Sequence, residues 1–356
     1  MSGAFIPMNR SFFDPVFYPV LRLAFGASLG LLLAKLTNSD QWGVFFTISP
    51  VLLLGLIPRL TPFVVLQYLA ANLLAALVVL AYFMLGGLSL VITLLVFGYF
   101  LWLFRLMAQG SYFVFAAISA INGSIFLHFA SYPGLDPAQM LGHALFAIMA
   151  ALLICGLMLM VFPLPERPIP QLPPKPRADQ LQQSLIAALL ATVSFVMFQL
   201  LDLQDSLSAQ ASSILILLPL SFSGIVQAGL KRASGVLLGS AYAIAVQLLL
   251  YDNYQHLPLT LLAFFFGMLL FGRAQQLEGP GSGVAFGGMT TMAIIFGQYL
   301  RSDHDLMYSA LYRISSVSVA VVATLVLVTV LYLWLAPQRP ELQKPISAEP
   351  GGNIGN

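Results

Sequence analysis

Two arginines stand inside long apolar segments, where a positive charge is costly and therefore informative. Arg22 lies in the first segment, in PVLRLAFGASLG, and Arg313 lies in the last, in SALYRISSVSV. A buried arginine costs about 2.5–3.5 kcal/mol at mid-helix on insertion scales, and less near a helix end. In a structural interpretation, Arg22 extends to the nearby membrane surface, and Arg313 pairs with Asp303 or Asp305. In a functional interpretation each binds an anion, because a guanidinium offers a carboxylate two parallel hydrogen bonds.

Acidic residues are missing from the middle of every apolar segment. Cation pumps and many proton-coupled carriers place a carboxylate there. A positive-only interior favours anionic cargo and leaves any proton coupling to His143 or to boundary acids such as Asp14, Asp40 and Glu278.

Small and hydroxyl-bearing residues are concentrated in the fifth apolar segment, GSYFVFAAISAINGSIF, and in the eleventh, GPGSGVAFGGMTTMAIIFGQ. Such segments most often pack tightly against neighbouring helices through glycine and alanine. The alternative is a pair of pore-lining segments whose polar side chains contact substrate. The side chains in question are Ser119, Asn122, Thr290 and Thr291.

Motifs for catalysis are absent from the sequence. It contains no phosphate-binding GxxxxGK[ST], no HExxH and no GxSxG, and its four histidines lack metal-ligand spacing. The single cysteine, Cys155, can form neither an intrachain disulfide nor a cysteine metal site. We expect no enzyme, no cofactor, no metal and no nucleic-acid partner.

The composition requires a membrane. Of the 356 residues, 59% are hydrophobic and 8% are charged, whereas soluble domains average about 25% charged residues. A membrane-spanning helix needs about 20 mostly apolar residues. The sequence therefore predicts an all-α integral membrane protein with about twelve transmembrane helices, at residues 16–36, 42–57, 62–85, 87–104, 111–129, 140–162, 183–201, 211–226, 233–251, 257–272, 281–299 and 307–336.

The second and eighth segments are short, and each contains a proline, Pro50 and Pro219. Proline removes a helical hydrogen bond, so we expect both helices to be kinked or broken and buried against protein or a cavity.

Basic residues set the expected orientation. With a cytoplasmic N-terminus, eleven lysines and arginines, the pair Lys231 and Arg232 among them, fall on inner segments, and Arg301 alone falls on an outer loop. We therefore predict that both termini are cytoplasmic.

The chain divides into two related halves. Residues 163–182 contain seven prolines and predict an extended cytoplasmic linker. Across it, Pro50 matches Pro219 and Asp136 matches Asp305 at a constant offset of 169 residues. We predict two tandem six-helix repeats in parallel orientation, at residues 1–162 and 183–336, followed by a disordered cytoplasmic tail at 337–356.

The segment LRLAFGASLGLLLAKL, followed by Trp42 and a proline-interrupted helix, resembles the start of members of the fusaric acid resistance and aromatic acid exporter superfamily. LKRASGVLLGSAYAIAV continues the likeness in the second half. The resemblance implies an efflux protein of the bacterial inner membrane that exports aromatic carboxylates with a periplasmic adaptor. Longer members carry a large cytoplasmic domain between the halves, where this chain has only the proline-rich linker.

We therefore expect export of small organic anions, with Arg22, Arg313, Ser119, Asn122, Thr290, Thr291 and His143 as substrate contacts. An anion channel and a non-transporting scaffold for an adaptor protein are the alternatives. Uphill flux separates a carrier from a channel, and a scaffold would tolerate changes to the interior polar residues. The substrate, the coupling ion, the oligomeric state and the need for an adaptor stay open.

Overall fold

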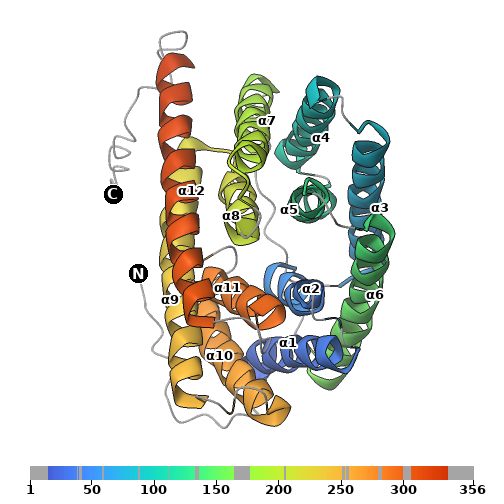
Figure 1. Cartoon of the computed structure of the whole chain (residues 1–356), viewed down its shortest axis with the longest axis vertical. Helices are drawn as coiled ribbons and strands as arrows, with labels where there is room; N and C mark the ends of the chain where they lie inside the picture. Colours follow the sequence, from blue (N-terminus) through green and yellow to red (C-terminus); the bar gives the residue numbers. More distant parts are fainter. Residues whose placement is uncertain are drawn as a thin grey trace, which may run out of the picture.

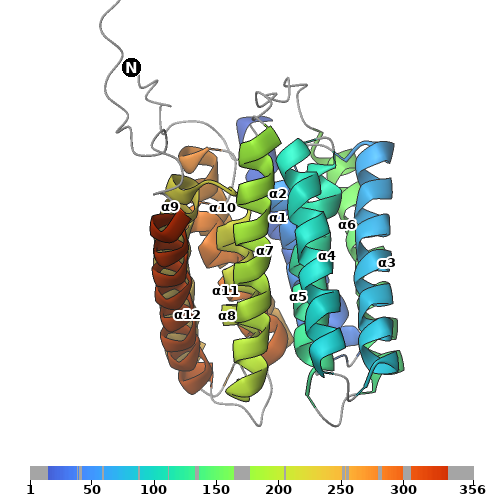
Figure 2. The same cartoon turned by 90° about the horizontal axis from the view of Figure 1, so that it is seen from above.

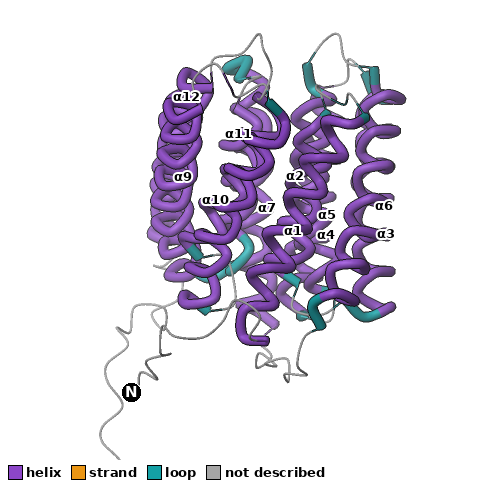
Figure 3. Tube along the Cα trace, turned by 90° about the horizontal axis from the view of Figure 1, so that it is seen from below, coloured by secondary structure: helices purple, strands orange, loops and turns teal. Residues whose placement is uncertain are grey.

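The computed structural model describes residues 15–37, 39, 42–57, 60–86, 89–110, 112–132, 136–163, 177–203, 206–250, 253, 256–279, 283–299 and 306–335. These residues form helices joined by short loops, without a strand (Figure 3). A short 3-10 helix, Pro15–Phe17, precedes twelve α-helices. They are α1 (Tyr18–Leu36), α2 (Gly43–Leu56), α3 (Pro62–Met84), α4 (Ser89–Gln109), α5 (Phe113–Ala130), α6 (Pro137–Val161), α7 (Arg177–Leu200), α8 (Leu207–Leu217), α9 (Phe222–Leu250), α10 (Leu257–Glu278), α11 (Val284–Tyr299) and α12 (Leu306–Leu335).

The helices stand side by side in one bundle (Figure 2). Among the described residues, nine helices are long and apolar enough to cross a membrane. The other three, α2, α8 and α11, are apolar but shorter. With its 11 residues, α8 extends over only about 16 Å at 1.5 Å per residue, against about 30 Å of hydrocarbon. The structure is therefore that of an all-helical, multi-pass membrane protein.

The short helices lie in the centre of the bundle, together with α5 (Figure 1). Every residue of α8 is buried, and so is every residue from 285 to 297 in α11. The remaining eight helices surround these four and turn apolar side chains outward. A short helix is tolerated at membrane depth because protein, and not lipid, surrounds its ends.

Several helix contacts in the first six helices recur in the last six. The helix α3 packs on α5 as α9 packs on α11, and α2 packs on α6 as α8 packs on α12. Between the two groups, α4 contacts α7 while α10 contacts α1, and α5 contacts α8 while α11 contacts α2.

The two ends of the bundle can be told apart by contacts between helix termini. Phe162, just after α6, packs on Tyr18 at the start of α1, and Gln275 near the end of α10 donates to the Gly55 carbonyl at 2.9 Å. We call this end, where α6 ends and α7 begins, the linker face. At the opposite end, the Tyr132 hydroxyl donates to the Phe198 carbonyl at 3.1 Å.

The two prolines behave differently. Pro50 stays inside α2, which is continuous. It leaves the Phe46 carbonyl without its helical N–H partner, and α1 approaches that carbonyl through Gly30, where a Cβ would collide with it. Pro219 instead follows the end of α8, and Leu220 adopts a left-handed conformation with φ of 62° before α9 begins. The break expected at Pro219 is therefore confirmed, and the segment at 211–226 divides between the end of α8 and the start of α9.

Two predicted boundaries in the second half are wrong. The helix α9 begins at Phe222, eleven residues before the expected 233, and includes Lys231 and Arg232. The charged pair interrupts an apolar pattern, but Arg232 is bonded inside the protein and does not end the helix. Similarly, α7 begins at Arg177, so residues 177–182 are helix and not linker, since no proline follows Pro176 there. The rest of the linker, from 164 to 176, lies outside the described residues.

The tail at 337–356 also lies outside the described residues, as do Asp14, Asp40, Arg301, Asp303 and Asp305.

Candidate functional site

The most unusual buried charge is Arg232 of α9. It is ten residues from the start of this helix, about 15 Å along its axis, and 5% exposed. Its Nε donates to Ser212 Oγ of α8 at 2.8 Å, and its Nη1 donates to Thr290 Oγ1 of α11 and, at 3.5 Å, to the Gly287 carbonyl. Its Nη2 has no hydrogen-bond partner within the described residues. Buried charged donors are normally saturated, so an open one marks a place for a ligand or water.

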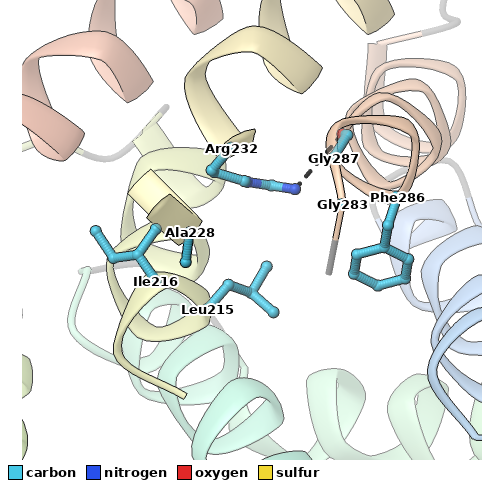
Figure 4. A pocket seen from close by; sticks show the side chains of 7 residues that line it. All are labelled: Leu215, Ile216, Ala228, Arg232, Gly283, Phe286 and Gly287. Carbon is cyan, nitrogen blue, oxygen red and sulfur yellow. Dashed lines mark hydrogen bonds between the residues drawn. The ribbon is translucent and has the colours of Figure 1, made fainter. Parts of the chain in front are cut away.

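Arg232 lines a small pocket at the linker-face ends of α8, α9 and α11 (Figure 4). Its other lining residues are apolar side chains or glycines: Leu215, Ile216, Ala228, Gly283, Phe286 and Gly287. The free space is about 10 Å³, room for one water molecule. We call it the Arg232 pocket. It combines an apolar wall, an aromatic ring and one guanidinium, the chemistry that a small organic anion requires.

Arg313 of α12 is the second buried charge near this site. It is 2% exposed, and its positive charge repels that of Arg232. The preceding residue, Tyr312, shares a hydrogen bond of 2.8 Å with Ser206 at the start of α8. No carboxylate of the described residues is bonded to Arg232, so its guanidinium creates a positive field beside α8.

Arg22 of α1 is buried elsewhere. It is 4% exposed, and its Nε and Nη1 have no hydrogen-bond partner among the described residues. It lies near the buried Cys155 of α6. It does not line the Arg232 pocket, and α1 packs mainly on α2, α6 and α10.

Ser119 and Asn122 of α5 are bonded to α3. Ser119 Oγ donates to the Ala71 carbonyl at 3.0 Å, and Asn122 Nδ2 donates to Asn72 Oδ1 at 2.7 Å. Both side chains are thus used in helix packing.

The threonines of α11 have different environments. Thr290 accepts the bond from Arg232 and donates to the Phe286 and Gly287 carbonyls, each at 3.0 Å. Thr291 is buried next to α9, near Gly239, and its hydroxyl has no partner among the described residues. Of the expected contacts, Thr290 is the one that is hydrogen-bonded to Arg232 within the described residues.

His143 lies far along α6 from the linker face and is half-buried. Its Nδ1 is 2.9 Å from the Gln139 carbonyl, and its ring stacks on Trp42 with centroids 6.3 Å apart. It belongs to an aromatic cluster with Phe45 and Phe129 and not to the arginine site. The described residues hold no group of three metal-ligating side chains.

Comparison with protein families gives two matches. Residues 19–158 match a family described as a protein of unknown function (DUF2955), and residues 190–327 match the family described as fusaric acid resistance protein-like. The second half of the chain is thus similar to fusaric acid resistance proteins. No curated protein and no solved structure matches the chain. The nine long apolar helices among the described residues are those of a multi-pass membrane protein.

Sequence patterns did not predict a buried site residue at Arg232, because the basic pair Lys231 and Arg232 indicates a cytoplasmic helix boundary. One signal could have found it. Small residues continue on both sides of the pair in QAGLKRASG, which is typical of a closely packed helix and not of a loop. In the structure Lys231 is exposed and Arg232 is buried, as expected for adjacent positions on different helix faces.

Proposed function

We propose that this protein exports small organic anions, aromatic carboxylates in particular, across the bacterial inner membrane. One observation carries the proposal: Arg232 presents a buried, unbonded Nη2 to an apolar pocket that contains an aromatic ring. A carboxylate would accept from that donor and neutralise a charge for which the described residues supply no acidic partner. Phe286 supplies the apolar surface that an aromatic cargo would contact.

The pocket must widen during transport, because its free space fits only one water molecule. Its wall is formed by α8 and α11, which belong to the central group of helices. A small separation of these helices would admit an aromatic acid, and the glycines on the α11 side, Gly283 and Gly287, would leave room for it. Such gating is typical of carriers that alternate between open and closed states.

The proposal includes two tandem six-helix repeats, at residues 1–162 and 183–336, related by an axis along the membrane normal. The recurring pairs of packed helices support this arrangement. So does the sequence offset of 169 residues. It matches Phe115 to Val284 and Gln67 to Val236. The Phe115 amide donates to Gln67 Oε1 at 3.0 Å, and Gly235, next to Val236, closely approaches Val284.

The proposal also places the linker face in the cytoplasm, on the basis of the positively charged inner segments. A periplasmic adaptor is the proposed partner, from the resemblance to the exporter superfamily. The Arg232 pocket would then receive its cargo from the cytoplasmic side.

The test measures efflux of a labelled aromatic carboxylate from cells with matched amounts of protein in the membrane. Arg232→Gln removes the charge, and we expect the affinity for the anion to fall about ten- to a hundredfold, since charge-assisted bonds contribute about 1.5–3 kcal/mol. Arg232→Lys should restore only part of it, because an ammonium lacks the planar fork. Lys231→Gln is the matched control, because it removes the neighbouring, exposed charge and should leave efflux unchanged.

Wild-type efflux from Arg232→Gln would overturn the proposed site. Efflux that occurs only down the concentration gradient of the anion would identify an anion channel instead of a carrier. If neither the wild type nor any variant moves an anion, and the interior polar residues tolerate substitution, the chain is a scaffold.

A further inference from the structure

One face of α8 joins the Arg232 pocket to the region of Arg313. Ser208, Ser212, Leu215 and Ile216 recur at the spacing i, i+4, i+7 and i+8, which places them on one side of a helix. Leu215 and Ile216 line the pocket, and Ser212 accepts the hydrogen bond from Arg232 Nε. The pocket wall therefore continues along α8, past Arg232, as far as Ser208.

Ser208 is an unsatisfied polar group at the far end of this face. It is 1% exposed, and its Oγ has no hydrogen-bond partner among the described residues. Serines inside a helix usually bond the carbonyl four residues before them, as Ser212 does to the Ser208 carbonyl at 2.6 Å. Ser208 is the second residue of α8, where the helix supplies no such carbonyl. A buried hydroxyl without such a bond is explained by an absent partner, such as water or a passing ligand.

Positive charge lies at both ends of this stretch. Arg232 is bonded at Ser212, and Arg313 follows Tyr312, which is bonded to Ser206. Ser206 and Ser212 are six residues apart, about 9 Å along the helix axis. An anion leaving one guanidinium would therefore reach the field of the other within about two turns of α8.

We infer that anions cross the protein along the Ser208 face of α8, from the Arg232 pocket to Arg313. This inference rests on the proposed function and adds the route to it. The path passes the Ser208 hydroxyl, which has no partner among the described residues, and the Ser212 hydroxyl, which donates to an anion once it leaves the Ser208 carbonyl. The neighbouring polar residue Gln210 lies on another face, where its Nε2 donates to Ser124 Oγ of α5 at 3.1 Å, and is outside the path.

The test uses cysteine labelling, which requires no knowledge of the cargo. Cys155 is the only cysteine of the chain, so Cys155→Ala provides a cysteine-free background. Ser208→Cys is then treated with a negatively charged and a positively charged methanethiosulfonate of similar size. We expect the negative reagent to react about tenfold faster or more, because the arginine charges concentrate anions near the thiol.

Ser213→Cys is the matched control. Ser213 is also 1% exposed on α8, but it lies on a different face and its hydroxyl donates to the Ala209 carbonyl at 3.1 Å. It should react slowly with both reagents. Adding Arg232→Gln to Ser208→Cys should reduce the charge preference to near one, while adding Lys231→Gln should not.

Equal rates for both reagents at Ser208→Cys, no reaction with either, or equal labelling of Ser208→Cys and Ser213→Cys would overturn the path. If Ser208→Cys does not reach the membrane, Leu215→Cys in the pocket wall replaces it with the same expectations. Charge-selective labelling without aromatic acid export would retain the path and reject the proposed cargo. Export of aromatic acids without charge-selective labelling would retain the function and reject this path.

Discussion

Asn122 of α5 donates a hydrogen bond from its side-chain amide to the side-chain oxygen of Asn72 in α3, at 2.7 Å. Both residues are buried, and Asn72 Nδ2 in turn donates to the Tyr68 carbonyl at 2.8 Å. Inside a membrane protein such a bond holds two helices together. Asn122 is therefore a packing residue in the state described here.

We predict that Asn72→Ala and Asn122→Ala each lower the thermal stability of the purified protein, and that the double variant is little worse than either single one. The expected coupling is about 0.6–1.7 kcal/mol, the range measured for such bonds in membranes. Thermal unfolding in detergent, monitored as loss of the monodisperse peak, measures the stability of each variant. Fully additive effects would show that the two amides do not act as a pair.

The Thr290 hydroxyl shares Nη1 of Arg232 with a more distant carbonyl. Thr290→Val keeps the side-chain shape and removes this acceptor, so the guanidinium should lose its fixed direction. We predict that the affinity for the exported anion falls about fivefold, corresponding to about 1 kcal/mol for one hydrogen bond. The concentration dependence of efflux measures this affinity. Thr291→Val, one position along α11 and without a bond to Arg232, is the control and should have a smaller effect.

The crossing of α9 and α11 depends on glycine. A Cβ on Gly235 would lie 2.7 Å from the Cα of Gly287, closer than real side chains approach a backbone. We predict that Gly235→Ala destabilises the protein by about 1–3 kcal/mol, as overpacking does. Gly98→Ala on α4 is the control, since its Cβ would meet nothing within 4 Å. Similar melting temperatures for the two variants would contradict the close approach.

The amino-acid sequence predicts most of the helices but not how they use their polar residues. Long apolar stretches define α1, α3 and α12 almost to the residue, because lipid demands continuous apolar surface. The central helices are harder, since protein surrounds them and polar groups are permitted. For this reason the start of α8 and the start of α9 were placed wrongly.

The polar contacts of the candidate site are likewise not predicted by the sequence pattern. A charge beside an apolar run predicts a membrane boundary, yet Arg232 lies inside because Ser212 and Thr290 bond it. These partners come from helices far apart in sequence, so one-dimensional patterns do not reveal them. Arg22 and Arg313 were found because each interrupts a long apolar run, and both are indeed buried.

The orientation of the bundle is tested by reporter fusions. We predict that a fusion after Arg177, at the linker face, reports the cytoplasm, and that a fusion after Asp136 reports the periplasm. Asp136 caps α6 by accepting from the Ala138 amide at 2.9 Å, at the opposite end of the bundle. Fluorescence of a cytoplasmic reporter and activity of a periplasmic phosphatase at each position measure the two compartments. The same compartment for both would contradict the arrangement.

The last prediction separates two roles for Arg313. If it binds the carboxylate of the cargo, Arg313→Gln should reduce the affinity for the exported anion about ten- to a hundredfold while folding survives. Arg313→Lys should restore part of it, since a single ammonium cannot form two parallel bonds.

If Arg313 instead braces the outer end of α12 through Asp305, then Asp305→Asn should mimic Arg313→Gln in both efflux and stability. Arg22 provides a second comparison, because a side chain that only extends to the membrane surface would work equally well as lysine. Its 4% exposure leads us to expect that Arg22→Lys is not equivalent to the wild type. Labelled aromatic acid retained by cells at matched membrane abundance is the common measurement. Wild-type efflux from both Arg22→Gln and Arg313→Gln would leave Arg232 as the one arginine of the three that can bind the anion.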